Sequence, residues 1–216
     1  MDVKLLYYDE FCKFSEFEHY AAFVSEERRI RLSQIKHDSD RLASLFAELL
    51  ARSEISQRSG IPQEKIEFGY GEHGKPFLVN DPGHHFSLSH SGGYVAFAQS
   101  GAPLGVDIQL ISRPRTRIAE KFFTKEEFAY IKSASDADRA FFHVWTRKEA
   151  YLKMLGTGIS IPLNSFDVLS DMPQCRLLTQ SLGGFMLSVC TADMQEHSIY
   201  TNEIGIDKVL GLFTAK

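Results

Sequence analysis

The chain has 216 residues, 44% of them hydrophobic and 24% charged, which is typical of one globular domain or of two small fused halves. Its formal net charge of -4 supplies no overall basic field for nucleic acid, so an anionic ligand has to be held by a local cluster of cations. Its three cysteines are widely spaced, which argues against a disulfide framework and is typical of a reducing compartment such as the cytoplasm.

The N-terminal part of the chain predicts a strand followed by two helices. KLLYY at 4–8 has the composition of a strand, and the acidic N-terminus with no long apolar run does not resemble a signal peptide. Ser25 and the two glutamates after it are typical of a helix N-terminus, and residues 40–58 predict a second helix that ends at Gly60. The apolar run at 42–51 is too short to cross a bilayer, so we expect a core helix there.

Alternating polarity predicts three strands in the middle of the chain. HFSLSH (85–90) and YVAFAQ (94–99) flank a glycine turn and predict a hairpin. The third segment, LGVDIQL (104–110), places Asp107 and Gln109 on the face opposite its aliphatic residues. Neighbouring oxygen donors suit Mg²⁺, although the solvent face of an edge strand has the same pattern.

The C-terminal part predicts two helices, at 114–134 and 136–155, followed by short strands. The strand-like runs are FDVL, CRLLT, FMLSVCTA and KVLGLF. Because strands and helices occur in both halves, the sequence predicts an α+β fold, which we divide into residues 1–110 and 111–216.

The second of these helices carries Trp145, Glu149 and Lys153 on one stripe, each four residues from the next. An exposed ion pair between Glu149 and Lys153 would contribute only about 0.2–0.5 kcal/mol. The single tryptophan on the same stripe and the glycine turn at 156–158 favour the wall of a cleft instead.

Two further segments have residue types that bind phosphate. Ser89 and His90 lie where a strand enters a glycine turn, which suits a phosphate oxygen, with a turn cap and a packed histidine as the alternative. Arg28 and Arg31 share a helix face, either as a phosphate clamp or as a solvated basic surface. Zinc at the histidine pair 84–85 is disfavoured, because adjacent strand residues point to opposite faces.

Five motifs in order resemble the signature of the 4′-phosphopantetheinyl transferases, in particular the surfactin-synthetase-activating type. They are GKPF (74–77), FSLSHS (86–91), GVDIQ (105–109), FFTKEE (122–127) and WTRKEAYLKMLGTG (145–158). The short, trimeric holo-acyl-carrier-protein synthases carry G-[IV]-D near the N-terminus, whereas here it lies mid-chain. The resemblance therefore implies a monomer of two similar α/β halves related by a pseudo-twofold axis, with the active site in the cleft between them.

The resemblance implies transfer of the 4′-phosphopantetheine group of coenzyme A to a serine of an apo acyl or peptidyl carrier protein, releasing adenosine 3′,5′-bisphosphate. Mg²⁺ is the implied metal, with Mn²⁺ as an alternative, and neither nucleic acid nor a membrane is an implied partner. By motif, the metal ligands are Asp107, Gln109 and Glu149, and the catalytic residues are Asp107, Glu149 and Lys153. The residues implied in binding coenzyme A are Arg28, Arg31, Ser44, Lys75, Pro76, Ser89, His90 and Lys153.

Two positions depart from the family pattern. The family usually has Glu or Asp at residue 109, and Gln109 brings no charge, so we expect weaker Mg²⁺ binding or a water in its place. Ala43 stands where an arginine is common, with Ser44 retained and Arg41 as a substitute. The alternatives are a non-catalytic relative that binds coenzyme A or a carrier, and a Mg²⁺-dependent hydrolase of nucleotide pyrophosphates.

Three roles complete the expectation. Glu149 is expected to hold the metal and accept the proton of the carrier serine, Lys153 to pair with the pyrophosphate, and Trp145 to pack beneath them.

An acidic carrier would dock on the segment after GVDIQ, although alternating arginines are commonly just solvated. The residues of that segment are Arg113, Arg115, Arg117, Phe122 and Phe123.

Overall fold

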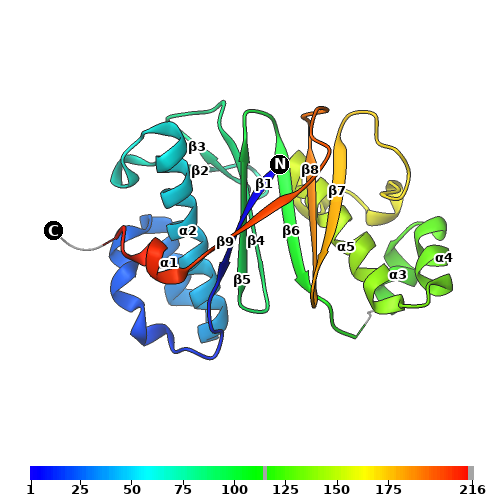
Figure 1. Cartoon of the computed structure of the whole chain (residues 1–216), viewed down its shortest axis with the longest axis horizontal. Helices are drawn as coiled ribbons and strands as arrows, with labels where there is room; N and C mark the ends of the chain where they lie inside the picture. Colours follow the sequence, from blue (N-terminus) through cyan, green and yellow to red (C-terminus); the bar gives the residue numbers. More distant parts are fainter. Residues whose placement is uncertain (114–115, 214–216) are drawn as a thin grey trace.

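The computed structural model describes residues 1–113 and 116–213, with helices at its two ends and the strands between them (Figure 1). Three short 3₁₀ turns and loops connect the first helices and strands, and two more follow the last long helix. The elements are β1 (Asp2–Tyr7), α1 (Glu26–Gln34), α2 (Asp38–Ser59), β2 (Phe68–Tyr70), β3 (Pro76–Leu78), β4 (His85–Ser91), β5 (Tyr94–Ser100), β6 (Leu104–Leu110), α3 (Thr116–Phe122), α4 (Lys125–Ser133), α5 (Ala137–Leu155), β7 (Arg176–Leu182), β8 (Phe185–Thr191), β9 (Tyr200–Ile204) and α6 (Ile206–Leu210).

Strand pairing repeats the same arrangement in two sheets. The first sheet has the order β4-β5-β1-β9 and the second the order β6-β8-β7. In the first sheet the hairpin β4–β5 pairs with the earlier strand β1, and in the second sheet the hairpin β7–β8 pairs with the earlier strand β6. In both cases helices lie between the earlier strand and the hairpin in the chain. The predicted α+β fold with two similar halves is confirmed.

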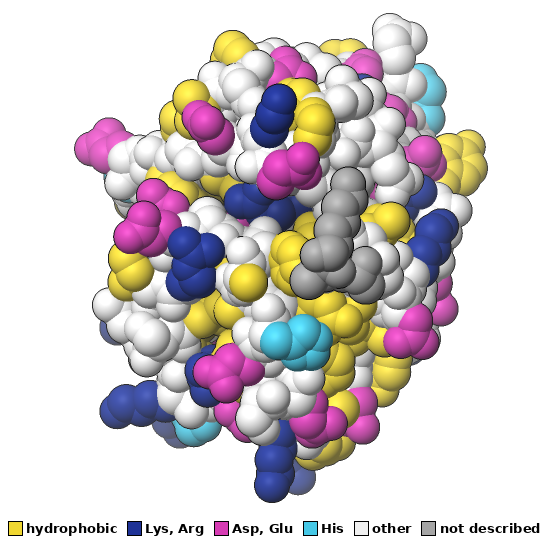
Figure 2. Space-filling model, turned by 90° about the vertical axis from the view of Figure 1, so that its left-hand side faces the viewer, with side chains coloured by type: hydrophobic (Ala, Val, Ile, Leu, Met, Phe, Trp, Pro, Cys, Tyr) yellow, Lys and Arg dark blue, Asp and Glu magenta, His cyan; other side chains and the backbone are white. Residues whose placement is uncertain are grey.

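The C-terminal segment crosses back to the first sheet. There β9 runs parallel to β1, and α6 packs against α2. Figure 2 shows the end of the molecule that carries α1, α2 and α6, where acidic and basic side chains are intermixed. The strand β6 pairs with β8 and so belongs to the second sheet, although it lies within residues 1–110. The division of the chain into residues 1–110 and 111–216 stays a prediction.

Apolar side chains form three successive layers. The layer between α2 and the first sheet includes Leu49 and Phe97. The layer between the two sheets includes Leu5 of β1 and Val106 of β6. The layer beneath α5 includes Val144. None of the helices within the described ranges is long and apolar enough to span a membrane.

The backbones of β6 and α5 lie in close contact at Gly105. A Cβ added there would lie 2.1 Å from the carbonyl oxygen of Ala150, so a larger residue would push the helix off the strand. The aliphatic side chains of β6 pack toward the other sheet. Because side chains alternate along a strand, Asp107 and Gln109 face the α5 side.

Local capping determines where several helices begin and end. The hydroxyl of Ser25 accepts a hydrogen bond from the backbone N–H of Arg28 at 3.2 Å, so the predicted start of α1 is confirmed. α2 ends at Gly60, which has the left-handed conformation with φ 74°. The predicted end of that helix is therefore confirmed as well.

The single helix predicted over 114–134 is wrong. Its described part forms α3 and α4, which are separated at Thr124. The Thr124 hydroxyl accepts a hydrogen bond from the N–H of Glu127, whose carboxylate accepts one from the N–H of Thr124. This capping box starts a new helix. Residues 114–115 lie outside the described ranges.

Two of the predicted strands are wrong. FDVL (166–169) forms no strand, because the backbone N–H of Val168 donates to the buried carboxylate of Glu127 instead of to a neighbouring strand. KVLGLF (208–213) includes the end of α6, whose Val209 packs into the layer beneath α2. The strand in this region is β9, and its polar sequence YTNEI is a weak strand signal.

Candidate active site

A cleft of about 460 Å³ opens where β4, β6 and the C-terminal end of α5 meet. One wall comes from the turn before β3 and from β4, and the other comes from β6 and α5. The predicted site residues that line it are Arg31, Lys75, Pro76, Ser89, His90, Asp107, Gln109, Glu149 and Lys153.

Three serines of β4 join the two sheets beside the cleft. Alternate hydroxyls of β4 accept hydrogen bonds from alternate backbone N–H groups of β6, whereas the two strands are not paired within one sheet. Side-chain oxygens thus take the place of backbone carbonyls along this seam. The pairs are Ser87 with Val106 at 3.0 Å, Ser89 with Ile108 at 3.2 Å and Ser91 with Leu110 at 3.0 Å.

Asp107 is only 2% exposed, and its carboxylate is held on both oxygens. Its Oδ1 accepts hydrogen bonds from Ser89 Oγ and Lys153 Nζ, both at 2.8 Å. Its Oδ2 accepts one from the side-chain amide of Gln109 at 3.2 Å. Lys153 Nζ also donates to one backbone carbonyl of β4 and one of β6. The lysine therefore neutralises a buried carboxylate at the seam between the sheets.

Glu149 is half-buried and lines the same cleft. Burial raises the pKa of its carboxyl above the ordinary value, the negative charge of Asp107 raises it further, and Lys153 lowers it. Within the part of the chain that the structure describes, neither a hydrogen bond nor an ion pair holds this carboxylate. A carboxylate that lacks its own cation, beside a second carboxylate, fits a divalent cation site.

The donor set also fits Mg²⁺. In residues 1–113 and 116–213 no three His, Cys, Asp or Glu side chains cluster in a metal-binding arrangement. The oxygen donors that the cleft offers a metal ion are the carboxylates of Asp107 and Glu149 and the amide of Gln109. Mg²⁺ in proteins is commonly held by one or two carboxylates, with water and phosphate oxygens completing the shell. The amide nitrogen of Gln109 faces Asp107, so its side chain has to turn to offer its oxygen.

Lys75 connects the GKPF turn to the end of α5. Its Nζ donates to the backbone carbonyls of Leu104 at 3.1 Å and Met154 at 3.0 Å. Burial lowers the pKa of this ammonium to about 8. A Cβ on Gly156, which ends α5 with φ 73°, would lie 3.2 Å from the Lys75 stem. The stem and Pro76 line the cleft, while the amine is held by backbone.

A second hollow of about 390 Å³ continues the cleft toward α1 and α2. Arg28, Arg31 and Ser44 line it, and His90 is shared with the cleft. The Arg28 guanidinium is fixed in place, since Nε donates to Glu48 at 3.1 Å and Nη1 donates to Ser44 at 3.0 Å. Glu48 is 1% exposed, so this arginine has a rigid anchor.

His90 lies where the two hollows meet. Its side chain is exposed at the rim, and the partial loss of water around the ring lowers the pKa of the imidazole, which the positive charge of Lys153 lowers further. Arg31 acts in the same direction, whereas Asp40 opposes it. The imidazole is therefore disposed to be neutral and to offer an uncharged N–H.

Two side chains singled out in the sequence, Trp145 and Arg41, line neither the cleft nor the second hollow. The Trp145 ring stacks on Phe141, with centroids 6.0 Å apart, in the apolar layer under α5. The Arg41 guanidinium lies 3.7 Å above the ring of Phe14 and lines neither hollow. Ala43, where the family commonly has an arginine, is 2% exposed. Arg41 therefore does not take the place of that arginine in the second hollow.

His73 also lines the cleft, although it lies outside the five motifs. A Cβ on Gly158 would lie 3.4 Å from Cβ of His73, so the turn before GKPF packs against the turn after α5. This contact joins segments far apart in the chain, which no local sequence pattern can predict.

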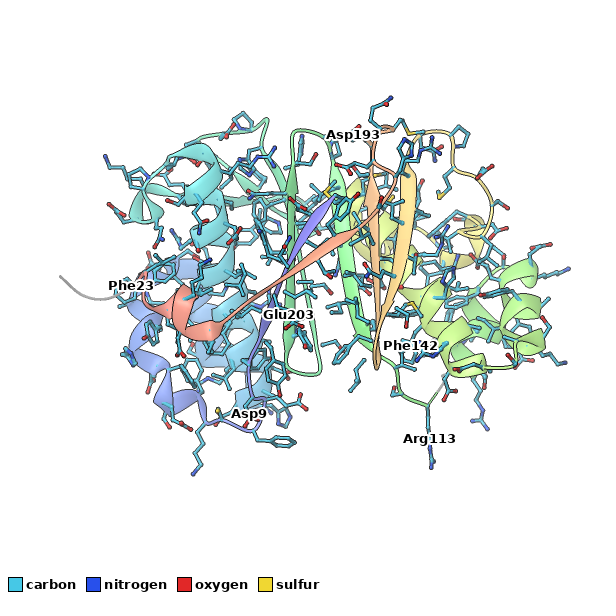
Figure 3. The ribbon with its side chains drawn as sticks, viewed as in Figure 1. Asp9, Phe23, Arg113, Phe142, Asp193 and Glu203 are labelled. Atoms are coloured by element: carbon cyan, nitrogen blue, oxygen red, sulfur yellow. The ribbon has the colours of Figure 1, made fainter. Side chains whose placement is uncertain are left out.

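The predicted docking segment is only partly at the surface. Arg113 is exposed and extends away from the body of the protein (Figure 3), and Arg117 is exposed as well. Phe122 is 45% exposed, but Phe123 is only 5% exposed and cannot contact a partner. Arg115 lies outside the described residues.

Two family models match consecutive parts of the chain. The 4′-phosphopantetheinyl transferase N-terminal model matches residues 12–102, and the 4′-phosphopantetheinyl transferase superfamily model matches residues 103–189. The chain is 34% identical over 207 residues to the 4′-phosphopantetheinyl transferase Sfp of Bacillus subtilis strain 168, covering 89% of this chain and 92% of that protein. It is 31% identical over 211 residues to the 4′-phosphopantetheinyl transferase gsp of Aneurinibacillus migulanus, covering 91% and 88%.

Proposed function

Because the chain belongs to the 4′-phosphopantetheinyl transferase superfamily, we propose that its cleft transfers the 4′-phosphopantetheine group of coenzyme A to a serine of an apo carrier protein. The observation that carries this proposal is the meeting of Asp107, Glu149 and Lys153 in a cleft that continues to Arg28 and Arg31. Coenzyme A carries a pyrophosphate and a separate 3′-phosphate, so a cation at each end matches its charges.

The second hollow takes the 3′-phosphate of coenzyme A in this proposal. Arg28, held by Glu48, and Arg31 supply the positive charge, and Ser44 supplies a hydroxyl. The adenine lies along the stem of Lys75 and the ring of Pro76. His90, between the two hollows, donates its imidazole N–H to a phosphate oxygen.

Asp107 and Glu149 would hold a divalent cation, Mg²⁺ or alternatively Mn²⁺, with Gln109 as a neutral third donor. When bound, such an ion supplies positive charge against the negative charge that builds up on the pyrophosphate. The raised pKa of Glu149 and its lack of a protein partner in the described residues support this assignment.

The transfer forms a bond between the carrier serine oxygen and the phosphorus that bears the pantetheine arm. The bond from that phosphorus to the bridging oxygen of the pyrophosphate breaks, and adenosine 3′,5′-bisphosphate leaves. Glu149 accepts the serine proton, directly or through a water, and general-base help of this kind is worth roughly 10²–10⁴ in rate. Lys153 has protein acceptors for all three of its N–H groups, so it acts on the leaving group through its charge.

Two other functions use the same cleft. A non-catalytic relative would bind coenzyme A or a carrier without transfer, with Gln109 and Ala43 as its support. A Mg²⁺-dependent hydrolase would cleave the pyrophosphate with water. The match to 4′-phosphopantetheinyl transferase models along the chain, and to relatives that carry this name, favours transfer over both.

One assay separates the three functions. The protein is incubated with coenzyme A, Mg²⁺ and an apo carrier domain, and the carrier is then weighed by mass spectrometry. Transfer adds the phosphopantetheine mass to the carrier and none to a carrier whose acceptor serine is alanine. An unmodified carrier with intact coenzyme A indicates the binding module, and cleaved coenzyme A with an unmodified carrier indicates the hydrolase.

We further propose that the protein acts as a monomer in the cytoplasm, without binding nucleic acid or membranes. The free thiols of Cys12, Cys175 and Cys190 support a reducing compartment. The negative net charge argues against nucleic acid as a partner, and the repeated two-sheet arrangement within one chain supports the monomer. Arg113 and Arg117 would meet the acidic surface of the carrier, with Phe122 as the apolar contact. Light scattering tests the monomer, and charge reversal at Arg113 should raise KM for the carrier without changing coenzyme A binding.

A further inference from the structure

We propose that Ser89 is a positioning residue for Asp107, which it orients so that Oδ1 is held by protein and Oδ2 is presented to a divalent cation. This rests on the proposed function, because the cation belongs to that reaction. The resemblance assigns Ser89 to a phosphate of coenzyme A instead, and the two roles make different demands on its hydroxyl.

The hydroxyl of Ser89 has one proton, and Asp107 accepts it. Ser89 Oγ donates to Oδ1 at 2.8 Å and accepts from the backbone N–H of Ile108 at 3.2 Å. A phosphate oxygen needs a donor, whereas this hydroxyl has only a lone pair left. Ser89 is also 6% exposed, in the wall of the cleft. Its hydroxyl therefore serves Asp107.

The register of the serine seam explains why only Ser89 has this role. Ser89 and Ser91 both accept a hydrogen bond from a backbone N–H of β6, and so both fasten β4 to β6. Only Ser89 lies opposite the position where β6 turns a carboxylate toward the cleft. Its hydroxyl links the first sheet to the acidic side chain of the second.

The two oxygens of Asp107 are held unequally. Oδ1 receives a hydroxyl and an ammonium, both at 2.8 Å, from Ser89 and Lys153. Oδ2 receives one neutral amide at 3.2 Å, from Gln109. Oδ1 is held by two short hydrogen bonds, one of them an ion pair, whereas Oδ2 is held by one longer amide bond. A cation therefore displaces Gln109 from Oδ2 more readily than it displaces the donors on Oδ1. The Ser89 bond thus fixes which oxygen faces the cleft.

The experiment compares Ser89→Ala with the matched control Ser91→Ala, which loses the same kind of seam hydrogen bond without touching Asp107 or the cleft. Mn²⁺ alone is titrated by electron paramagnetic resonance, and coenzyme A is titrated by calorimetry in the presence of a chelator. We expect Ser89→Ala to weaken Mn²⁺ binding about tenfold, the effect of one hydrogen bond to a charged group. Metal-free coenzyme A binding should stay within twofold.

The control and a rescue variant separate positioning from general damage. Ser91→Ala should lower the melting temperature and leave Mn²⁺ affinity unchanged, and Ser89→Thr, which keeps a hydroxyl, should restore Mn²⁺ binding. The proposal is overturned if Ser89→Ala weakens metal-free coenzyme A binding and spares Mn²⁺, which is the result of a phosphate contact. Equal loss of Mn²⁺ affinity in both alanine variants, or no Mn²⁺ binding by the wild type, also overturns it.

Neither titration depends on group transfer. If the wild type fails to modify a carrier but the Mn²⁺ pattern holds, the proposed function fails and the positioning role stands. If the wild type modifies a carrier and Ser89→Ala keeps its Mn²⁺ affinity, only the positioning role fails.

Discussion

Lys153 Nζ lies 2.8 Å from Oδ1 of Asp107, and this ion pair joins the C-terminal part of α5 to the middle of β6. The two side chains are unequally exposed, 30% for the lysine and 2% for the aspartate. The aspartate therefore depends on the lysine for charge compensation, whereas the partly exposed charge of the lysine can also act on an anion in the cleft.

Removing the lysine should leave Asp107 as an uncompensated buried charge. We expect Lys153→Met to lower the free energy of unfolding by about 1–3 kcal/mol, less than for a fully buried pair because the lysine is partly solvated. Adding Asp107→Asn should recover most of that loss while leaving the protein inactive. Urea unfolding of the wild type, the two single variants and the double variant measures the coupling between Lys153 and Asp107. Strictly additive losses of stability would contradict this coupling.

Glu149→Gln keeps the size of the side chain and removes its charge and basicity. We expect the rate of carrier modification to fall about 10²–10⁴-fold, which is the usual contribution of a general base. The affinity for coenzyme A should change only a few-fold. Glu126→Gln, at an exposed glutamate in the first turn of α4, is the control. Turnover of the Glu149 variant near the wild-type rate would refute its role.

Gln109 supplies an amide where a carboxylate would add charge to the cation site. We expect Gln109→Glu to tighten Mn²⁺ binding about tenfold, because a third negative charge lies near the cation. The same charge should destabilise the metal-free protein, since it adds repulsion beside Asp107 and Glu149. Gln109→Ala serves as the neutral control, and unchanged Mn²⁺ affinity in the glutamate variant would rule residue 109 out as a ligand.

His143 predicts a pH dependence of stability that is independent of the cleft. Burial, with a smaller effect of Arg147, lowers the pKa of its imidazole from 6.5 to about 4. Between these values the unfolded chain binds the proton and the folded chain does not. The neutral histidine therefore gives its full contribution above pH 6.5, and that contribution falls as the pH drops toward 4.

His143→Gln removes this titration. The stability of the wild type relative to the variant should fall by about 1–2 kcal/mol between pH 7.5 and pH 4.5, less than the full pKa shift implies because the half-buried imidazole is partly solvated. Chemical unfolding at several pH values measures the difference. Parallel pH profiles for the two proteins would show that the histidine is solvated.

The sequence predicted those features that neighbouring residues determine. Ser25 caps α1 and Gly60 ends α2, because capping is a local property. The alternation of β6 placed Asp107 and Gln109 on one polar face. The break at Thr124 was also readable, since a threonine with a glutamate three residues on is a capping box.

Partners across the fold could not be predicted in this way. Lys148 and Lys153 look alike in the sequence of α5, yet Lys148 is 0% exposed and pairs with Glu127 at 2.8 Å, away from the cleft. Similarly, nothing in FSLSHS distinguishes Ser89 from Ser91 until β6 lies beside β4. Both assignments depend on which side chain a distant segment brings into contact.

The central claim is that Asp107 and Glu149 share one divalent cation that also binds the pyrophosphate of coenzyme A. Anomalous diffraction from crystals grown with Mn²⁺ and coenzyme A tests it most directly. The account predicts a single manganese peak about 2.0–2.3 Å from a carboxylate oxygen of each residue and from a pyrophosphate oxygen. A peak that contacts only one of the two carboxylates, or no manganese in the cleft while coenzyme A is bound, would contradict it.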